Sequence, residues 1–406
     1  MAVPAQCTAE AAIFLPSVME ELNITMHKND IVKIYGECYK DMTIELLEYC
    51  KLAERIPDTS VRVGIKPNLV APSEASWGAT THPEVVAGII EYLQKHGFFN
   101  LIMLESSWVG DKTSESIEVC GYDKLIETYH VPFIDLQKDS NTERDCAGMA
   151  LHICDTVETV DFLINVPVLK GHCQTKMTCA LKNMKGLIPN TEKRHFHACG
   201  LHQPIAHLNA YLHQDFIVVD HICGDLDFED GGNPVTRNCL MAGCDPVLMD
   251  TYCCGLLHIP VEEVPYIGLS AALGVGSPDA KQAQVTVIGE KTKWNELDLP
   301  YATKVVELKD AVEEVDSCSA CYGYLLPALD MLKEEGLFEK LQEKICIGQG
   351  YRGKTGQLGV GNCTSKFDFC VKGCPPTEQE IYEQLKADIL QSSACVILCI
   401  QRENFR

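Results

Sequence analysis

Short apolar runs alternate with helical stretches from residue 61 onward, and this alternation most limits what the chain can fold into. The apolar runs read VRVGIKPN, NLIMLES, PFIDL, TVDFLINVPV and FIVVDH. The segment PEVVAGIIEYLQKHG predicts a helix, because Pro83 and Glu84 suit a first helical turn and Gly97 suits a helix end. Strands that alternate with helices predict an α/β fold with a mostly parallel, buried sheet and flanking helices.

Cysteine placement divides the chain into two parts. Fourteen of the 22 cysteines precede residue 318 and eight lie in the last 89 residues, where glycine also becomes frequent. We therefore predict an α/β domain over residues 1–316 and a small Cys/Gly-rich module over residues 317–406. Residues 1–60 are predicted to be a mostly helical N-terminal part of the first domain.

Charge and composition limit the partners and the location of the protein. A formal net charge of −23 argues against binding to nucleic acid and to anionic membranes. No apolar run approaches the length of a membrane-spanning helix, and the start MAVPAQCTAEAAIFLP lacks the basic and apolar regions of a signal peptide. We therefore expect a cytoplasmic protein with reduced thiols.

The C-terminal cysteines predict a metal centre. Cys318 and Cys321 form a CxxC pair, Cys363 lies in GNCT and Cys374 lies in VKGCPP. Four thiolates can hold an iron–sulfur cluster, and the dense glycines let the backbone pass close to such a bulky group. We predict that these four residues ligate one [4Fe–4S] cluster, with Cys370 as the alternative to Cys374.

Other interpretations of this tail remain open. A structural zinc ion would account for the cysteines but not for the glycines. A thioredoxin-like dithiol at CSAC would leave the GNCT and GCPP cysteines unexplained. The letters GxGxxG occur in IGQGYRG, but the following sequence is rich in glycine rather than helical, which argues against a dinucleotide site. Inert buried thiols are the fourth interpretation.

A basic, histidine-rich stretch lies between residues 166 and 214. It holds six of the 13 histidines, and its basic residues Lys170, Lys176, Lys182, Lys185, Lys193 and Arg194 accompany one acid, Glu192. Such a stretch in an acidic protein can attract an anionic substrate. Lysines on solvated loops and histidines that fill crevices are the competing explanation for each residue taken singly.

The predicted strands place several polar residues at one edge of the sheet. Lys170 and His172 follow FLINVPV, Lys66 and Asn68 lie in VGIKPN, and Glu105 ends IMLE. Open α/β sheets bind ligands at the carboxyl ends of their strands, so we expect these loops to converge on a substrate site. Lysines there would hold an anionic group, and a histidine would move a proton.

Ordered motifs in this region are similar to those of a known family. The motifs are KPNLV, THPEVV, FLINVPVLKGH, ALKNMKGLIPNTEKRHFHACGLH, IVVDHICGDLDFEDGGNP and GCDPVLMDTYCCGLL. From about Val61 to about Asp279 they resemble the family named domain of unknown function 362. The resemblance implies an α/β domain linked to iron–sulfur chemistry, often in anaerobes, without an established general reaction.

The resemblance also implies a set of site residues. The family's shared polar positions fall on Lys66, Asn68, His82, Lys170, Lys182, Asn183, Lys185, His197, Asp245 and Asp250. Combined with the strand-end argument, these positions predict His172, His197, Lys182 and Lys185 as catalytic and Lys66, Asn68, His82, Lys170 and Asn183 as substrate-binding. The chain lacks the paired CxxCxxCxxxCP runs that many relatives append, so a two-cluster electron wire is not expected.

Three functions compete at this stage. The first is a reductase, an iron–sulfur oxidoreductase in which the [4Fe–4S] cluster relays electrons to a small anionic substrate or ligates it directly, with a ferredoxin-type electron donor. The second is a non-redox lyase that uses an open cluster iron as a Lewis acid. The third is an electron-transfer or cluster-carrier protein. A homo-oligomeric state is left open.

Overall fold

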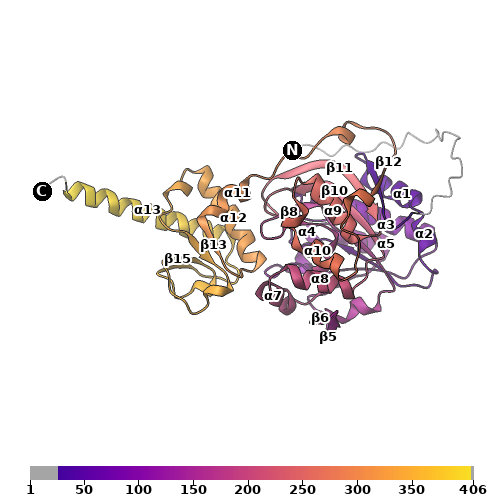
Figure 1. Cartoon of the computed structure of the whole chain (residues 1–406), viewed down its shortest axis with the longest axis horizontal. Helices are drawn as coiled ribbons and strands as arrows, with labels where there is room; N and C mark the ends of the chain where they lie inside the picture. The colour runs from indigo at the N-terminus through magenta and orange to yellow at the C-terminus, as the bar shows by residue number, and fades with distance from the viewer. Residues whose placement is uncertain (1–25, 404–406) are drawn as a thin grey trace.

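A larger α/β unit and a smaller C-terminal module make up the structure, a computed structural model (Figure 1). It describes residues 26–403, with the side chains of this segment except Glu296, Ser319 and residues 392–403. No helix within residues 26–403 combines the length and apolar character that crossing a membrane requires.

An eight-stranded sheet forms the centre of the larger unit. Its spatial order is β12-β1-β11-β10-β7-β2-β3-β4, and every pair is parallel except the two that β11 makes. The mostly parallel sheet is therefore confirmed. The strands are β1 (Asp30–Tyr35), β2 (Val63–Pro67), β3 (Leu101–Glu105), β4 (Phe133–Asp135), β7 (Phe162–Val166), β10 (Phe216–Asp225), β11 (Pro234–Gly243) and β12 (Gln284–Ile288).

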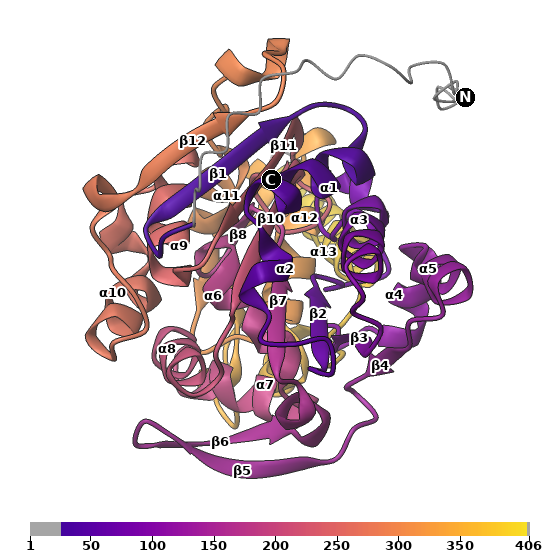
Figure 2. The same cartoon turned by 90° about the vertical axis from the view of Figure 1, so that its right-hand side faces the viewer.

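Helices cover both faces of this sheet, as Figure 2 shows. One face carries α1 (Tyr39–Tyr49), α2 (Leu52–Arg55), α3 (Pro83–Lys95), α4 (Thr113–Val119) and α5 (Tyr122–Tyr129), and the other α6 (Ala180–Asn183), α8 (His202–Tyr211), α9 (Pro246–Leu256) and α10 (Pro265–Ala272). Successive strand residues alternate between two cores: Val218 packs on the first side and Val219 on the second. The flanking helices of the prediction are thus also confirmed.

The strand order reverses between β2 and β7. From β2 the chain moves outward to β3 and β4, then returns to the other side of β2 with β7 and continues to β10. Loops that leave the carboxyl ends of β2 and β7 therefore diverge and leave a crevice, which is where sheets of this kind bind ligands. The hairpins β5 (Asn141–Cys146)–β6 (Met149–Cys154) and β8 (Lys170–His172)–β9 (Lys176–Thr178), and α7 (Asn190–Ala198), lie between β4 and β10 in the chain.

The C-terminal module contains its own parallel sheet. Its four strands pair in chain order, from β13 (Val312–Glu314) through β14 (Ile345–Ile347) and β15 (Leu358–Val360) to β16 (Phe369–Val371). Helices α11 (Lys304–Leu308), α12 (Ser319–Glu334) and α13 (Glu378–Glu403) complete it. Leu308 and Val312 belong to its hydrophobic core, so this structural unit begins ahead of residue 317.

Residues 26–60 contain a strand in addition to the helices that the sequence predicts for this part of the chain. Residues 1–25 lie outside the described residues, and the chain then forms strand β1 before helices α1 and α2. The strand reads DIVKIY, and all of its residues except Asp30 are buried. Its β-branched residues pack well on a pleated sheet, and this packing outweighs the helical context around them.

Close contact between α1 and α3 generates a stability prediction. A Cβ at Gly88 of α3 would lie 2.7 Å from the Lys40 carbonyl oxygen and 2.7 Å from Thr43 Cβ, whereas at Gly268 of α10 it would meet nothing within 4 Å. We expect Gly88→Ala to destabilise the protein by about 1–3 kcal/mol through overpacking. The matched Gly268→Ala is expected to stabilise it by up to about 1 kcal/mol, because alanine favours helix. Urea unfolding followed by circular dichroism measures both, and equal effects would contradict the close packing.

Candidate functional site

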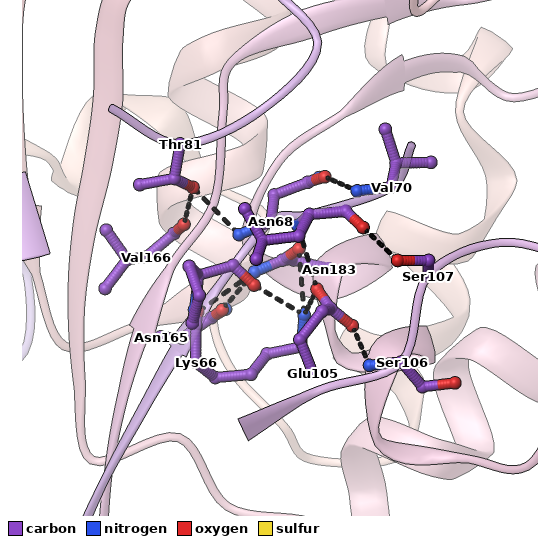
Figure 3. A network of polar contacts seen from close by, with 12 residues as sticks. Lys66, Asn68, Val70, Thr81, Glu105, Ser106, Ser107, Asn165, Val166 and Asn183 are labelled. Atoms are coloured by element: carbon purple, nitrogen blue, oxygen red, sulfur yellow. Dashed lines mark hydrogen bonds and ion pairs between the residues drawn. The ribbon is translucent and has the colours of Figure 1, made fainter. Parts of the chain in front are cut away.

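A buried lysine and a buried glutamate begin the site at the ends of two neighbouring strands. Lys66 of β2 and Glu105 of β3 form an ion pair of 2.6 Å (Figure 3). The same ammonium donates to the Pro67 carbonyl at 3.0 Å and to Asn183 Oδ1 at 3.1 Å. All three N–H donors of Lys66 are thus engaged within the protein, and the lysine fixes the orientation of Glu105.

Asn183 ties α6 to the carboxyl ends of the strands. Its Nδ2 donates to Asn165 Oδ1 of β7 at 2.7 Å, as Figure 3 shows. Gly186 lies against the ion pair, and a Cβ there would lie 1.7 Å from Glu105 Oε1. Glycine is therefore required at this position for the loop to pack directly on the Lys66–Glu105 pair.

Glu229 collects three of the predicted site residues. Its carboxylate lies 3.0 Å from Lys182 Nζ, 3.5 Å from Lys170 Nζ and 3.1 Å from His172 Nε2. His172 Nδ1 accepts from the backbone N–H groups of Gln174 at 3.0 Å and Thr175 at 3.2 Å, so the ring proton is on Nε2, facing Glu229. Glu229 comes from the loop after β10.

The loop that carries Glu229 is organised by Asp225. The Asp225 carboxylate accepts from the backbone N–H groups of Asp227, Phe228, Gly232 and Asn233, which closes the turn. Glu229 itself has a φ of 87°, in the left-handed region that non-glycine residues rarely adopt. Strain of this kind persists only where surrounding contacts impose it, and here the contacts are the two lysines and the histidine.

Burial shifts the pKa values of the basic groups downward. It lowers the pKa of Lys66 and of Lys170, and it lowers the pKa of His172 to about 4. Burial would raise the pKa of Glu229, but His172, Lys182 and Lys170 outweigh it and hold that pKa well below its usual range. The arrangement therefore consists of an ionised Glu229 beside a neutral His172 at neutral pH.

A small cavity lies among these groups, and we call it the lysine pocket. Its volume is about 70 Å³, and it is lined by Asn68, Val70, Glu105, Ser106, Trp108, Thr178, Lys182, Asn183, Lys185, Gly186, Lys193 and Glu229. Lys193 donates three hydrogen bonds, to the Ser106 carbonyl and hydroxyl and to the Ser107 carbonyl. Lys185, by contrast, makes no hydrogen bond or ion pair with the described residues, and burial lowers its pKa to about 7.

The structure brings most of the predicted site residues together, but not all of them. Asn68, Lys182, Asn183 and Lys185 line the lysine pocket, while Lys66, Lys170 and His172 lie directly behind it. His82 lies outside the lysine pocket, at the start of α3. Its Nδ1 is 2.9 Å from Asp220 Oδ2. His197 of α7 is buried, and burial lowers its pKa well below the ordinary value.

The four predicted cysteines gather at the carboxyl edge of the second sheet. Cys318 follows β13 and Cys321 lies in the first turn of α12, while Cys363 follows β15 and Cys374 follows β16. Burial raises the pKa of Cys318 and of Cys321, and the other thiols of the group raise both further. These four thiols, which we call the cysteine group, are therefore close enough to interact electrostatically.

The alternative ligand Cys370 has a different environment. Its Sγ lies 3.3 Å from Thr364 Oγ1 and 3.5 Å from the Gly361 carbonyl oxygen, inside the module. Cys374, by contrast, is exposed and acts on the pKa of both Cys318 and Cys321. The geometry thus favours Cys374 over Cys370 as the fourth member of the group.

The carboxyl edges of the two sheets face each other. A second small cavity joins them, lined by Trp108, Val109, Lys185, Lys193, Arg194, His197, Cys318 and Ala320. The aromatic pair Trp108–Tyr324, with ring centroids 5.3 Å apart, and the hydrogen bond from Gln174 to Ser317 Oγ at 2.8 Å hold the module in this position. Lys185 and Lys193 line both cavities.

Within the described residues, no three His, Cys, Asp or Glu side chains lie close enough together to ligate a single metal ion.

Sequence reasoning misses two residues that organise the site. Glu229 lies in an acidic DFED run before a glycine pair, which is typical of an ordinary turn. Lys193 is predicted only as a member of the basic stretch. One signal could identify Glu229 from the sequence. Lys170, His172 and Lys182 lie upstream with no acidic residue near them in the sequence, and buried cations require an acidic partner.

The half-buried Lys185 generates a pH prediction. Its pKa falls from 10.5 to about 7 on folding, so between these values the unfolded chain binds more protons and wild-type stability rises with pH. We expect Lys185→Met to stabilise the ligand-free chain by on the order of 1–3 kcal/mol near pH 7, with an advantage that shrinks as the pH rises toward 9.

Chemical denaturation of both proteins across this pH range measures the effect. Lys176→Met is the matched control, because the Lys176 side chain is 42% exposed and its ammonium forms an ion pair with the exposed Glu263. A stability advantage of Lys185→Met that does not change with pH would refute the assignment.

One relative and two solved structures are similar to this chain over part of its length. Thylakoid-associated protein sll1697 of Synechocystis sp. is 24% identical over 231 residues, which are 54% of this chain and 70% of that protein. A crystal structure of a protein from Thermotoga maritima aligns at a TM-score of 0.31 with 13% identity, over 46% of this chain and 51% of that one. The lactate racemase apoprotein from Thermoanaerobacterium thermosaccharolyticum aligns at 0.34 with 15% identity, over 56% and 57%.

The two solved structures carry no argument about this chain, because their TM-scores are low and the alignment spans only about half of each. The sequence match is more specific and falls on the segment that forms β2 through most of α9. The C-terminal module lies beyond that segment. Residues 63–255 match the family described as domain of unknown function (DUF362), which confirms the resemblance over that part of the chain.

Proposed function

We propose that the chain is an iron–sulfur reductase in which the lysine pocket binds a small anionic substrate and the cysteine group holds one [4Fe–4S] cluster. One observation carries the proposal: Cys318 lines the same small cavity as Lys185 and Lys193, where the carboxyl edges of the two sheets meet. A substrate in the lysine pocket would thus lie next to the cysteine group, with no intervening layer of secondary structure.

The chemistry of the donors fits such a cluster. Four sulfur donors lie on three loops and one helix start, and Cys363 acts on the Arg352 guanidinium and raises its pKa. The glycines that are frequent around these cysteines let the backbone pass close to a bulky group, which a single zinc ion would not require. When bound, a [4Fe–4S] cluster supplies or accepts one electron at a time.

Lysines outnumber the carboxylates that pair with them directly at the pocket. Glu105 and Glu229 make these pairs, and the lysines in or behind the pocket are Lys66, Lys170, Lys182, Lys185 and Lys193. Lys182 divides its donors between Thr178 and Glu229, at 3.0 Å each, and so keeps one N–H for a ligand. A bound anion would supply the missing negative charge, and a cavity of about 70 Å³ suits a small one.

The remaining candidates divide into groups that reach the substrate and groups that position them. Lys185 and His197 line the cavity beside Cys318. Lys185, whose pKa is lowered to about 7, can donate a proton to a reduced substrate, whereas the neutral His197 ring can accept one or hydrogen-bond the substrate. His172 and Lys170 act on the substrate only through Glu229 in this geometry. We assign them a positioning role, because they hold the acid that orients Lys182.

An external electron donor follows from the reductase proposal. Arg194 and Arg352 are exposed and both act electrostatically on the Cys318 thiol. They offer positive charge beside the cysteine group in an otherwise acidic protein, which suits an acidic ferredoxin-type donor. The cytoplasmic location remains a prediction.

Cysteine variants provide the first test of the proposal. We expect Cys318→Ser and Cys321→Ser to lose most of the iron and acid-labile sulfide of anaerobically purified protein, since each removes a ligand. Cys370→Ser is the matched control from the same module and is expected to keep both. Unchanged iron in Cys318→Ser, or equal loss in Cys370→Ser, would refute the ligand set, and zinc without sulfide would replace the cluster with a single-ion site.

Lysine variants provide the second test. We expect the double variant Lys182→Ala, Lys185→Ala to weaken binding of small anions such as sulfite, phosphate and acetate by 10-fold or more, measured by calorimetry, because it removes the two lysines with donors to spare. Lys176→Ala is the control on an exposed lysine. Equal anion affinity in all three proteins would remove the site assignment.

Spectroscopy during turnover separates the competing functions. Oxidation of the photochemically reduced protein by sulfite, the readily reducible member of this set, supports the reductase. A spectral change on anion addition without net oxidation would indicate the lyase, and indifference to every anion would indicate an electron carrier.

A further inference from the structure

We propose that Cys199 is a reactive thiol that small hydroperoxides oxidise, with His195 as its base and Glu192 as the acid that orients this base. The three residues, which we call the thiol triad, lie along α7 and at its C-terminal end. None of them lines the lysine pocket or the cavity beside Cys318. The proposal is therefore independent of the reductase function.

Two hydrogen bonds connect the thiol triad. Cys199 Sγ lies 3.0 Å from His195 Nε2, and His195 Nδ1 lies 2.7 Å from Glu192 Oε1. A carboxylate only accepts hydrogen bonds, so His195 Nδ1 carries the ring proton and Nε2 presents its lone pair to the thiol. A nucleophile next to a base that a third group orients is the arrangement that activates thiols and hydroxyls in enzymes.

A second element holds Glu192 in place. The residue is 3% exposed, and its Oε2 accepts a hydrogen bond of 3.1 Å from the backbone N–H of His152 on β6 and lies 3.0 Å from His152 Nδ1. The negative charge of Glu192 and the C-terminal end of α7 both favour a positive charge on His195, which lies in the last turn of the helix. The geometry therefore supports transfer of the thiol proton to His195.

The thiol itself is open to solvent. Cys199 is exposed, and the His195 side chain is 50% exposed. A small reactant can thus reach Cys199 Sγ without movement of the chain. Reactive cysteines are typically accessible thiols next to a group that favours the thiolate, and His195 is that group here.

The position at a helix end favours a hydroperoxide over an acyl group as the reactant. Acyl transfer needs N–H donors for the developing oxyanion, whereas a helix C-terminus presents carbonyl oxygens and the negative end of the helix dipole. Attack on a hydroperoxide needs a proton donor for the leaving oxygen instead. Protonated His195 is such a donor.

The reaction is complete with the thiol triad and one molecule of hydrogen peroxide. His195 Nε2 takes the proton of Cys199, and the thiolate attacks one peroxide oxygen, so that an S–O bond forms and the O–O bond breaks. The leaving oxygen takes the proton back from His195 and departs as water. The sulfur loses two electrons and becomes a sulfenic acid, and the peroxide is reduced.

Trapping of the sulfenic acid tests the proposal on the full chain. Limiting hydrogen peroxide is added in the presence of dimedone, and peptide mass spectrometry measures the dimedone adduct on Cys199 relative to that on Cys38. Cys38 is also exposed, and the ratio cancels any peroxide that other groups consume. We expect Cys199 to be labelled about 10-fold or more faster than Cys38, because a positioned base assists it.

Histidine variants distinguish a base from a structural residue. His195→Ala is expected to lower the ratio of Cys199 to Cys38 labelling by about 10-fold or more, and added imidazole is expected to restore part of it, because the exposed site admits a free base. His27→Ala, at an exposed histidine near the start of the described residues, is the matched control and is expected to leave the ratio unchanged.

Four results would overturn the proposal. Equal labelling of Cys199 and Cys38 would show that the thiol is not activated. An unchanged ratio in His195→Ala, or a loss that imidazole does not restore, would remove His195 as the base. A preference of Cys199 over Cys38 that is larger for p-nitrophenyl acetate than for peroxide would replace the oxidation with acyl transfer.

Discussion

The placement of five lysines around two buried carboxylates, those of Glu105 and Glu229, dictates how the strand-end loops pack. An unpaired buried charge is costly, so each lysine has to find a partner or shift its pKa. Lys66 and Lys193 satisfy all of their N–H donors with oxygens at the strand ends and, for Lys66, with Asn183 of α6. Lys182 does so only in part, and Lys185 not at all within the described residues, which concentrates the unmet positive charge at one small cavity.

The two sheets are arranged so that their functional loops meet. The strands that carry the functional loops are parallel in each sheet, so these loops leave from one carboxyl edge. The two carboxyl edges face each other across Trp108, Lys185 and Cys318. This arrangement brings thiols and ammonium groups into one place, although the segments that carry them lie far apart in the sequence. The proposed function depends on how the module packs against the larger unit.

Much of the fold could be predicted because short stretches of sequence indicate individual strands and helices. Short apolar runs predict β2, β3, β7 and β10, and Pro83 and Gly97 bracket α3. The tendency of parallel strands to gather their functional loops at the carboxyl edge also predicts that Lys66, Asn68 and Lys170 lie near one another. The four cysteines gather for a similar reason, because each follows a strand or begins a helix at the same edge of one parallel sheet.

Local sequence predicts the α/β architecture and the residue types at the strand ends, because apolar periodicity and strand-end position depend on neighbouring residues alone. The pairing of the polar groups depends on the folded chain. Glu229 is the partner of three basic groups, and Lys182 keeps a spare donor, through contacts between loops distant in sequence. Burial sets the cost of each charge, and burial exists only once the chain has folded.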